Sequence, residues 1–250
     1  MRSRQRKQIE MHQGLAEEYD LRYAPAFSKL FQRYWNGELL RRMNLAPGSK
    51  VLDLGCGTGI LLASLADEGY RAVGTDISRT MLSRARGTAP LVTADGGNLP
   101  FTDASLDAVL ARGAIHHMQD IPAVLREILR VLRHGGQVVL SEPSNDFYPI
   151  RAARSLMYRK SRHFDHEDTA FRSVRFESMM LEAGFVQVKL DRFGFLAYAL
   201  AGFPDVLPVL TYVPFSTPMT RWMISVDRLL ARTPVVRSFS FHLIAVGVKP

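Results

Sequence analysis

An acidic residue and three closely spaced glycines stand together in VLDLGCGTG, residues 51–59. Asp53 lies in a short apolar run typical of a buried strand, and Gly55, Gly57 and Gly59 follow it at every second position. Because glycine has no Cβ, such a turn can adopt positive φ angles and let a ligand lie against the backbone. The amides that open the next helix are then available to a ligand carboxylate. The segment therefore predicts a cofactor-binding turn.

The spacing of these glycines argues against a dinucleotide site. That fingerprint is G-x-G-x-x-G, and counted from Gly55 its third glycine falls at Ile60. An acid inside the strand, as at Asp53, is also atypical of it. The arrangement D-x-G-C-G-T-G instead resembles the first motif of the class I S-adenosylmethionine-dependent methyltransferases, in particular the type 11-like group with small-molecule or lipid substrates. The resemblance implies S-adenosyl-L-methionine as the cofactor.

The resemblance continues in register over residues 45–190. It implies that Asp76, in GTDIS, accepts hydrogen bonds from both ribose hydroxyls, a task that suits the two oxygens of a carboxylate. Asp95, in TADGGNLPF, matches the acid near the adenine amino group. The segment LRHGGQVVLSEP resembles the fifth-strand motif, with His134 where proline is commoner. The other cofactor-site residues that the resemblance implies are Cys56 packed beside the cofactor, Gly96 next to Asp95, Ile77 and Met81 on the adenine ring, and Arg112 at the methionine moiety.

Two tyrosines upstream, Tyr19 and Tyr23 in AEEYDLRYAP, resemble the N-terminal lid segment of many such enzymes. An aromatic face favours a positive sulfonium, and we assign Tyr19 to the cofactor site on that ground. The alternative is that both tyrosines only pack the first helix against the sheet.

His116 and His117, in ARGAIHHM, are the candidate catalytic residues. A sulfonium is already an activated methyl donor, so such an enzyme mainly aligns an acceptor lone pair in line with the methyl group and excludes water. A neutral hydroxyl acceptor also gains from a nearby proton acceptor, a role that histidine takes near neutral pH. The alternative is that these histidines only hold the loop.

Two polar clusters have the residue types of binding sites, one for a metal ion and one for phosphate, but each has a simpler explanation. The segment HFDHEDT has the donor types of a divalent-metal site, but before a helix it is more often a solvated capping turn, and we predict no bound metal. Its candidate ligands are His163, Asp165, His166 and Asp168. A basic run could meet phosphate but is typical of a solvated helix face, and it comprises Arg151, Arg154, Arg159, Lys160 and Arg162.

These residues need a parallel sheet to position them. From Lys50 to about Val248, short β-branched runs alternate with amphipathic helical patterns. This alternation predicts an α/β fold with a doubly wound, mostly parallel seven-stranded sheet of the Rossmann-like type. The expected strands are residues 51–54, 72–75, 91–93, 108–111, 137–141, 186–190 and 241–248.

Caps and glycines predict where the helices begin and end. Ser78 is expected to cap a helix that carries Met81, and Asp120 to cap one that carries apolar residues as far as Leu132. Gly135 and Gly184 are expected to mark two helix C-termini.

The last two strands are separated by residues 192–240, far more than a hairpin loop needs. Within this insertion, an apolar run over 193–215 contains Asp205 and three prolines, which argues against an uninterrupted transmembrane helix. We expect an N-terminal helical lid over 1–44, a catalytic domain over 45–191 and 241–250, and an inserted acceptor cover over 192–240. Alternatives for the insertion are a helical extension of the core, a homodimer interface, or a membrane-surface contact helped by Arg221, Arg228 and Arg232.

The 250-residue chain has a formal net charge of +8 and one cysteine, Cys56. One cysteine forms no internal disulfide, and the basic, polar first 14 residues lack a signal-peptide core, so we expect the cytoplasm, with peripheral membrane contact left open. The charge favours anionic partners, but no RNA-binding module is apparent. We expect methyl transfer by in-line displacement to a small, lipophilic O-, C- or N-nucleophile. The alternatives are an RNA or protein methyltransferase, or a non-catalytic cofactor-binding scaffold of the same fold.

Overall fold

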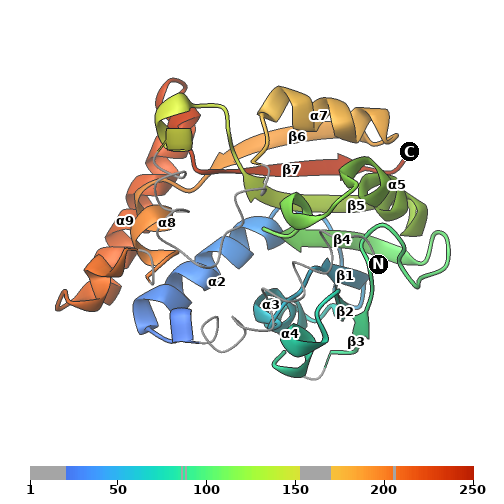
Figure 1. Cartoon of the computed structure of the whole chain (residues 1–250), viewed down its shortest axis with the longest axis horizontal. Coiled ribbons are helices and arrows are strands. Elements are labelled where there is room, and N and C mark those ends of the chain that lie inside the picture. Colours follow the sequence, from blue (N-terminus) through green and yellow to red (C-terminus); the bar gives the residue numbers. More distant parts are fainter. Residues whose placement is uncertain (1–20, 86, 88, 153–169, 205–206) are drawn as a thin grey trace.

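One seven-stranded sheet organises the part of the chain that the computed structural model describes, residues 21–85, 87, 89–152, 170–204 and 207–250. The strand order is β3-β2-β1-β4-β5-β7-β6, and β7 alone runs antiparallel to its two neighbours (Figure 1). The strands are β1 (Lys50–Leu54), β2 (Arg71–Asp76), β3 (Leu91–Thr93), β4 (Leu106–Arg112), β5 (Leu132–Pro143), β6 (Val186–Phe193) and β7 (His242–Val248). The predicted α/β, mostly parallel sheet is therefore confirmed.

Alternating apolar residues divide the core into two layers, one on each face of the sheet. Val51 and Leu110 belong to one buried cluster, whereas their neighbours Leu52 and Val109 belong to the other. Successive side chains of a strand point to opposite faces, so a strand that is apolar throughout can bury both. This is why the central strands read as continuous runs of Val, Leu and Ala.

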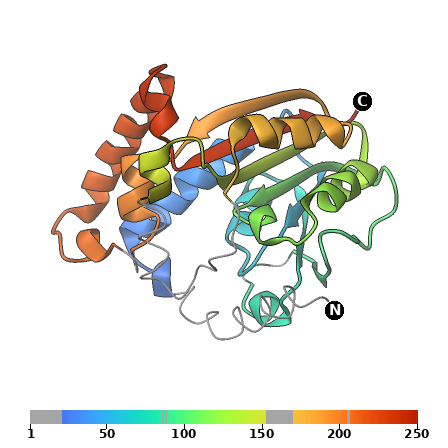
Figure 2. The same cartoon turned by 45° about the horizontal axis from the view of Figure 1, so that its top comes forward.

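Helices cover both faces (Figures 1 and 2). On one face, the buried cluster is built with α2 (Ala26–Leu40), α3 (Ile60–Asp67), α4 (Arg79–Ser83), α8 (Leu196–Ala201) and α9 (Ser216–Arg232). On the other, it is built with the short η1 (Ile115–His117), α5 (Ile121–Val131) and α7 (Ser173–Glu182). Two more short helices are η2 (Pro208–Thr211) and η3 (Val236–Phe239).

Two of the predicted helix caps are confirmed. The Ser78 side chain accepts a hydrogen bond from the Met81 amide at the start of α4, and the Asp120 side chain accepts one from the Ala123 amide at the start of α5. Gly184 also lies where expected, just beyond α7 and with a φ of 105°.

The expected end of the Asp120 helix is wrong. α5 ends at Val131, and Leu132 is already extended and fully buried as the first residue of β5. Gly135 lies inside β5 with a φ of 72°, near the point where the register between β4 and β5 shifts. The glycine therefore serves an irregular strand instead of stopping a helix.

The long connection between β6 and β7 leaves and returns at one edge of the sheet. Phe193, which ends β6, pairs with His242, which begins β7, and His242 also pairs with Pro143 at the end of β5. The helices of this connection, α8 and α9, lie together beside α2 at that edge (Figure 1). None of the helices in the described ranges is both long and apolar enough to cross a bilayer. The proposed three-part division of the chain remains a prediction.

Candidate active site

One pocket follows the carboxyl edge of the sheet, and residues from both ends of the chain line it. Two sequence-predicted residues are not part of this lining. Gly59 is the N-cap of α3, with a φ of 79°, and Tyr19 lies outside the described residues. The other predicted residues all line the pocket, namely Asp53, Gly55, Cys56, Gly57, Asp76, Ile77, Met81, Asp95, Gly96, Arg112, His116 and His117.

The glycine-rich turn after β1 forms the floor of the pocket. Gly55 has a φ of 71°, and a Cβ there would come within 2.5 Å of the Ala114 Cβ. The Gly55 and Cys56 amides both donate to the Thr75 carbonyl oxygen, which ties the turn to β2. The close approach to Ala114 therefore requires glycine at position 55.

Asp76, at the end of β2, is held rigidly beside this turn. Its Oδ2 accepts a hydrogen bond from the Gly57 amide at 3.0 Å, and its Oδ1 accepts one from the Ser78 amide at 2.8 Å. Each carboxylate oxygen has more than one lone pair, so both can still accept from a ligand. The orientation of this carboxylate is fixed before any ligand arrives.

Asp53 is a buried acidic residue of the pocket whose carboxyl group is only partly hydrogen-bonded. Its side chain is 1% exposed, and its Oδ2 has no hydrogen-bond partner among the described residues. The pKa of Asp53 is raised to about 7, mainly by burial, which Arg112 opposes and Asp76 reinforces. A buried acceptor of this kind calls for a donor or a cation from a ligand.

Arg112, at the end of β4, connects the pocket to α2. Its Nη1 donates to Asn36 Oδ1 at 2.6 Å, and its guanidinium lies 4.9 Å from the Trp35 ring centroid. Asn36 in turn donates to the Ile60 carbonyl oxygen and to Ser64 Oγ of α3. A single side-chain network thus joins α2, α3 and β4 behind the pocket.

A tight loop after β3 forms the far end of the pocket. Met81 is 3% exposed, and a Cβ at Gly96 would come within 2.6 Å of Met118 Sδ. Asp95 is exposed, and its Oδ1 accepts from the Gly97 amide at 3.1 Å. The loop thus presents a carboxylate and a close-packed backbone next to the apolar Met81.

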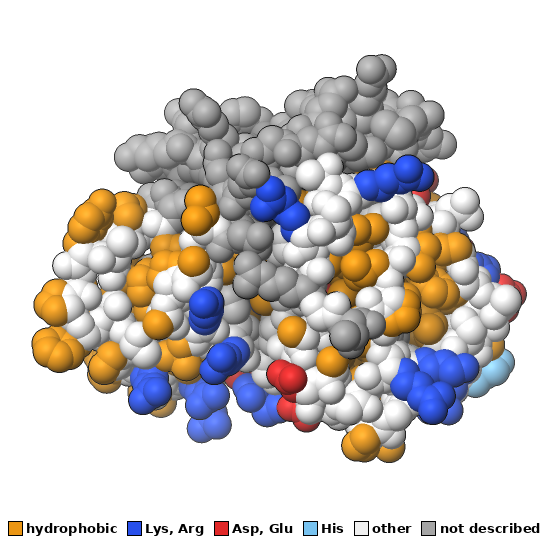
Figure 3. Space-filling view, turned by 90° about the horizontal axis from the view of Figure 1, so that it is seen from below, with side chains coloured by type: hydrophobic (Ala, Val, Ile, Leu, Met, Phe, Trp, Pro, Cys, Tyr) orange, Lys and Arg blue, Asp and Glu red, His pale blue; other side chains and the backbone are white. Residues whose placement is uncertain are grey.

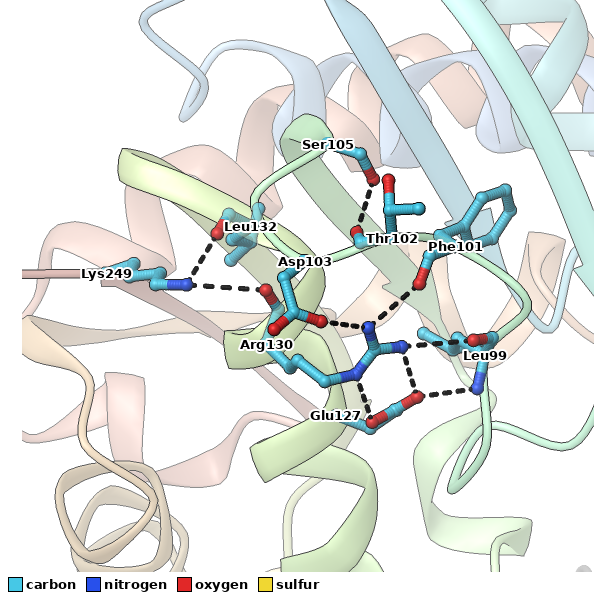
Figure 4. Close-up of polar contacts among 9 residues, drawn as sticks. All are labelled: Leu99, Phe101, Thr102, Asp103, Ser105, Glu127, Arg130, Leu132 and Lys249. Atoms are coloured by element: carbon cyan, nitrogen blue, oxygen red, sulfur yellow. Dashed lines mark hydrogen bonds and ion pairs between the residues drawn. The ribbon is translucent and has the colours of Figure 1, made fainter.

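Arg130 of α5 fastens the loop that continues from this end of the pocket (Figure 4). Its guanidinium donates to both oxygens of Glu127, to Asp103 Oδ1 and to the carbonyl oxygens of Leu99 and Phe101. Glu127 Oε1 also accepts from the Leu99 amide at 2.8 Å. The hydrogen bonds from Arg130 hold the pKa of Glu127 below its usual value.

His116 is held by a buried carboxylate from the neighbouring strand. Its Nδ1 lies 2.6 Å from Oε2 of Glu142, which is fully buried at the end of β5. Because an ionised carboxylate only accepts, a neutral imidazole in this position would donate from Nδ1 and leave Nε2 as the acceptor. The same carboxylate accepts from the amides of Ala114, Ile115 and His116, so it fixes the loop as well as the ring. The ring of His117 lies 3.9 Å from that of His116.

The other half of the pocket combines residues of the expected acceptor cover and lid, Tyr198, Phe203 and Tyr23, with residues that the sequence did not indicate, Arg22, Trp35 and His242. His242 begins β7, Tyr198 comes from α8, Phe203 follows α8, and Trp35 lies on α2. Arg22 and Tyr23 also line this half, near the start of the described chain. The signal that could have found His242 is its place at the start of the final expected strand, on the edge where the cofactor motifs also lie.

A hydrogen-bonded chain supports His242. Trp35 Nε1 donates to Ser141 Oγ at 2.9 Å, and Ser141 Oγ lies 3.3 Å from His242 Nδ1. The imidazole also packs against the rings of Trp35 and Tyr198, with centroid distances of 5.0 and 4.7 Å. An imidazole held in an aromatic wall can contact an acceptor or accept a proton from it.

Two earlier interpretations concern residues away from this chemistry. All four candidate metal ligands of HFDHEDT and most of the basic run lie outside the described residues. The described ranges contain no group of three or more His, Cys, Asp or Glu side chains suited to a metal ion.

Cys56 lies in the pocket wall. Burial, with Asp53 and Asp76 nearby, raises the pKa of the Cys56 thiol, which leaves it protonated.

Comparison with known sequences places the segment from β1 to β5 in one family. The family described as "Methyltransferase domain" matches residues 52–140. A demethylmenaquinone methyltransferase of Mycolicibacterium gilvum is 30% identical over 199 residues, which cover 78% of this chain and 78% of that protein. One from Corynebacterium urealyticum is 41% identical over 118 residues, or 47% of this chain and 51% of that protein. The match thus spans about half the length of that relative, and 61–64% of the length of three others with the same name.

A solved structure shares the fold over nearly the whole chain. It is described as "Complex between the Haloferax volcanii Trm112 methyltransferase activator and the putative methyltransferase". The similarity has a TM-score of 0.63 at 25% sequence identity, and it covers 93% of this chain and 98% of that chain.

Proposed function

This chain belongs to the class I S-adenosylmethionine-dependent methyltransferases, and we propose that it methylates a small lipophilic acceptor of the isoprenoid-quinone type. The observation that carries the proposal is the composition of the pocket. A half rich in glycine and carboxylate adjoins a half lined by Trp35, Tyr198 and Phe203. The relatives named demethylmenaquinone methyltransferase support the same class of acceptor.

The polar half fits S-adenosylmethionine. The unpartnered Oδ2 of Asp53 suits the cationic part of its methionine moiety, and the fixed carboxylate of Asp76 suits the ribose diol. Asp95 and Gly96 suit the adenine amino group, with Ile77 and Met81 against the ring. When bound, the cofactor supplies a methyl group already activated by the sulfonium.

The remaining residues align the acceptor and manage its proton. The aromatic wall orients an apolar ring and excludes water from the line of transfer. His116, whose Nδ1 donates to Glu142, holds its Nε2 ready to accept a proton from an acceptor hydroxyl. His242 is the second candidate for this proton, because it lies in the aromatic wall itself.

Peripheral contact with the cytoplasmic face of a membrane belongs to this proposal. An acceptor with an isoprenoid tail partitions into bilayers, so the enzyme meets it at a membrane surface.

An acceptor assay tests the proposed function. The protein is incubated with labelled S-adenosylmethionine and either a prenylated naphthoquinol in detergent or its water-soluble analogue without the tail. We expect label in the prenylated product and a lower KM for it than for the analogue. Failure to methylate any quinol, by protein that still binds the cofactor, would contradict the assignment.

A pair of variants connects the assay to the pocket. Phe203→Ala removes part of the apolar wall and should raise the KM for the prenylated acceptor while leaving the Kd for S-adenosylmethionine nearly unchanged. Tyr148→Ala is the matched control, because Tyr148 is 76% exposed and does not line the pocket.

A further inference from the structure

Large hydrophobic side chains remain exposed on α9 and on the turn that precedes it. Tyr212 and Phe215 are each 81% exposed, Trp222 is 61% exposed, and Leu229 is 66% exposed. Figure 3 shows hydrophobic side chains gathered at the end of the molecule where α9 lies, with Lys and Arg along the adjoining edge. We call Tyr212, Phe215, Trp222 and Leu229 the apolar stripe.

The spacing of the apolar stripe follows the helix. Phe215, Trp222 and Leu229 are seven residues apart, close to two helical turns, so they share one side of α9. The opposite side of α9 buries Met223 and Ile224 in the core. Phe215, at the N-cap, has a φ of 65°, a conformation that costs free energy for a side chain with Cβ. Phe215 is therefore both strained in its backbone and exposed in its side chain.

Positive charge borders the stripe. Arg221 and Arg228 precede Trp222 and Leu229 by one residue each, and Arg232 follows one turn later. All three arginines are exposed. The one acid between residues 207 and 240 is Asp227, which is buried and accepts hydrogen bonds from three backbone amides at the start of α8. Arg228 is partly compensated, because its Nε lies 4.0 Å from Glu38 Oε1 and its guanidinium lies over the Tyr34 ring. Arg221 and Arg232 have no acidic partner among the described residues, so this side of the molecule presents apolar side chains next to positive charge.

We propose that the apolar stripe and its arginines dock the protein on an anionic lipid surface. On such a surface, aromatic side chains enter the interfacial region and arginines contact the anionic headgroups. A second copy of this chain suits the face less well, because a symmetric contact would bring the arginines of both copies together.

The docking proposal deepens the proposed function and rests on its lipophilic acceptor. α9 belongs to the same connection as Tyr198 and Phe203, which line the acceptor half of the pocket. Docking through α9 brings that half of the enzyme to the lipid in which the acceptor is dissolved.

Trp222 is a built-in reporter for the test. The chain has two tryptophans, and the other, Trp35, is 6% exposed. Full-length protein is titrated with vesicles of phosphatidylcholine alone or mixed with phosphatidylglycerol. We expect a blue shift of the tryptophan emission only with the anionic vesicles, lost in Trp222→Phe.

Vesicle sedimentation of variants separates the two contributions. Arg221→Gln combined with Arg232→Gln should lower the partition coefficient about 30-fold, because each basic residue near an anionic surface contributes about fivefold. Phe215→Ser should lower it with the charge unchanged. The matched controls are Arg126→Gln and Val174→Ser on α5 and α7, whose side chains are exposed on the other face of the sheet and should leave partitioning unchanged.

Three results would overturn the proposal. The first is no shift of the tryptophan emission with anionic vesicles. The second is an equal loss of partition coefficient in the stripe variants and in the controls. The third is an emission shift without vesicles, together with a dimer in sedimentation equilibrium. Vesicle binding needs no methyl transfer, so the two proposals fail separately. A protein that docks but methylates no quinol refutes only the acceptor, and one that methylates quinols without docking refutes only the docking surface.

Discussion

We expect one buried carboxyl group, that of Asp53, to make cofactor binding depend on pH. Burial raises the pKa of Asp53 to about 7, whereas the unfolded value is 3.8. Between these values the folded protein holds a proton that the unfolded chain has lost, so this group makes the ligand-free protein less stable as pH rises from 3.8 to about 7. A cationic ligand group prefers the ionised carboxylate and has the opposite effect on binding.

We therefore expect the Kd for S-adenosylmethionine to fall as pH rises through about 7, with release of a proton below that pH. Titration calorimetry over a pH series, in buffers of different ionisation enthalpy, measures both quantities. Asp53→Asn should flatten the profile. An unchanged pH dependence in that variant would show that another group is responsible.

Asp76 is expected to contribute to binding more than to folding. Asp76→Ala should weaken S-adenosylmethionine binding by about 1–3 kcal/mol, because two ribose hydroxyls lose a charged acceptor. Asp120→Ala is the control, since it removes a helix cap outside the pocket and should lower only the free energy of unfolding. Equal Kd values for wild type and Asp76→Ala would show that Asp76 is a turn residue and does not contribute to cofactor binding.

The pocket holds three candidates for the proton acceptor, His116, His117 and His242. His116→Ala should slow turnover of a hydroxyl acceptor about a hundredfold or more, while the cofactor Kd stays nearly constant. Glu142→Gln should shift the pH profile of kcat, because the carboxylate that sets the His116 tautomer is gone. If His116→Ala turns over at the wild-type rate and His242→Ala does not, the assignment passes to His242.

At the residue scale, the sequence could predict the cofactor half of the pocket and little of the acceptor half. Asp53 and Asp76 lie near the ends of β1 and β2, and Gly55 follows β1, so short patterns locate them. Tyr198 and Phe203 belong to the apolar insertion that was expected to cover the acceptor, but their positions in the pocket, and that of His242, depend on tertiary packing of distant elements, which no local pattern records.

At the element scale, Arg130 couples α5 to the loop that continues from the Asp95 end of the pocket. Arg130→Met should lower the free energy of unfolding by about 1–3 kcal/mol, since Glu127 and two carbonyl oxygens lose a charged donor. Because the pKa of Glu127 is held below 4.5, the stabilisation is present above that pH and is lost as pH falls through the folded value. Urea titrations at neutral and acid pH measure it. A wild-type midpoint for the variant would contradict the coupling.

Helix starts were easier to predict than helix ends. Ser78 and Asp120 cap their helices through side-chain hydrogen bonds that depend on neighbouring residues alone. The end of α5 depends instead on β4, because Leu132 pairs with Leu106 and is drawn into the sheet. Gly135, three residues later, does not indicate that Leu132 joins β5 instead of continuing α5.

At the scale of the whole molecule, the connection between β6 and β7 is part of the core as well as a wall of the pocket. Tyr198, Leu210, Met223 and Ile224 belong to the same buried cluster as Phe31. Replacing residues 194–240 with a Gly/Ser linker should therefore abolish cooperative unfolding, as followed by circular dichroism. Replacing only 234–239, none of which is buried, should preserve it. A folded 194–240 replacement that binds cofactor would instead make the insertion a separable cover.

The position of β7 also sets the order in which the sheet can be completed. Among the described strands β6 pairs only with β7, yet a ribosome makes β6 first and then the whole α8–α9 connection. At roughly 5–20 residues per second, the nascent chain keeps the edges of β5 and β6 open for several seconds. During that interval the open strand edges can pair with other chains. We therefore expect the nascent chain to be most prone to aggregation, and to chaperone binding, just before β7 emerges.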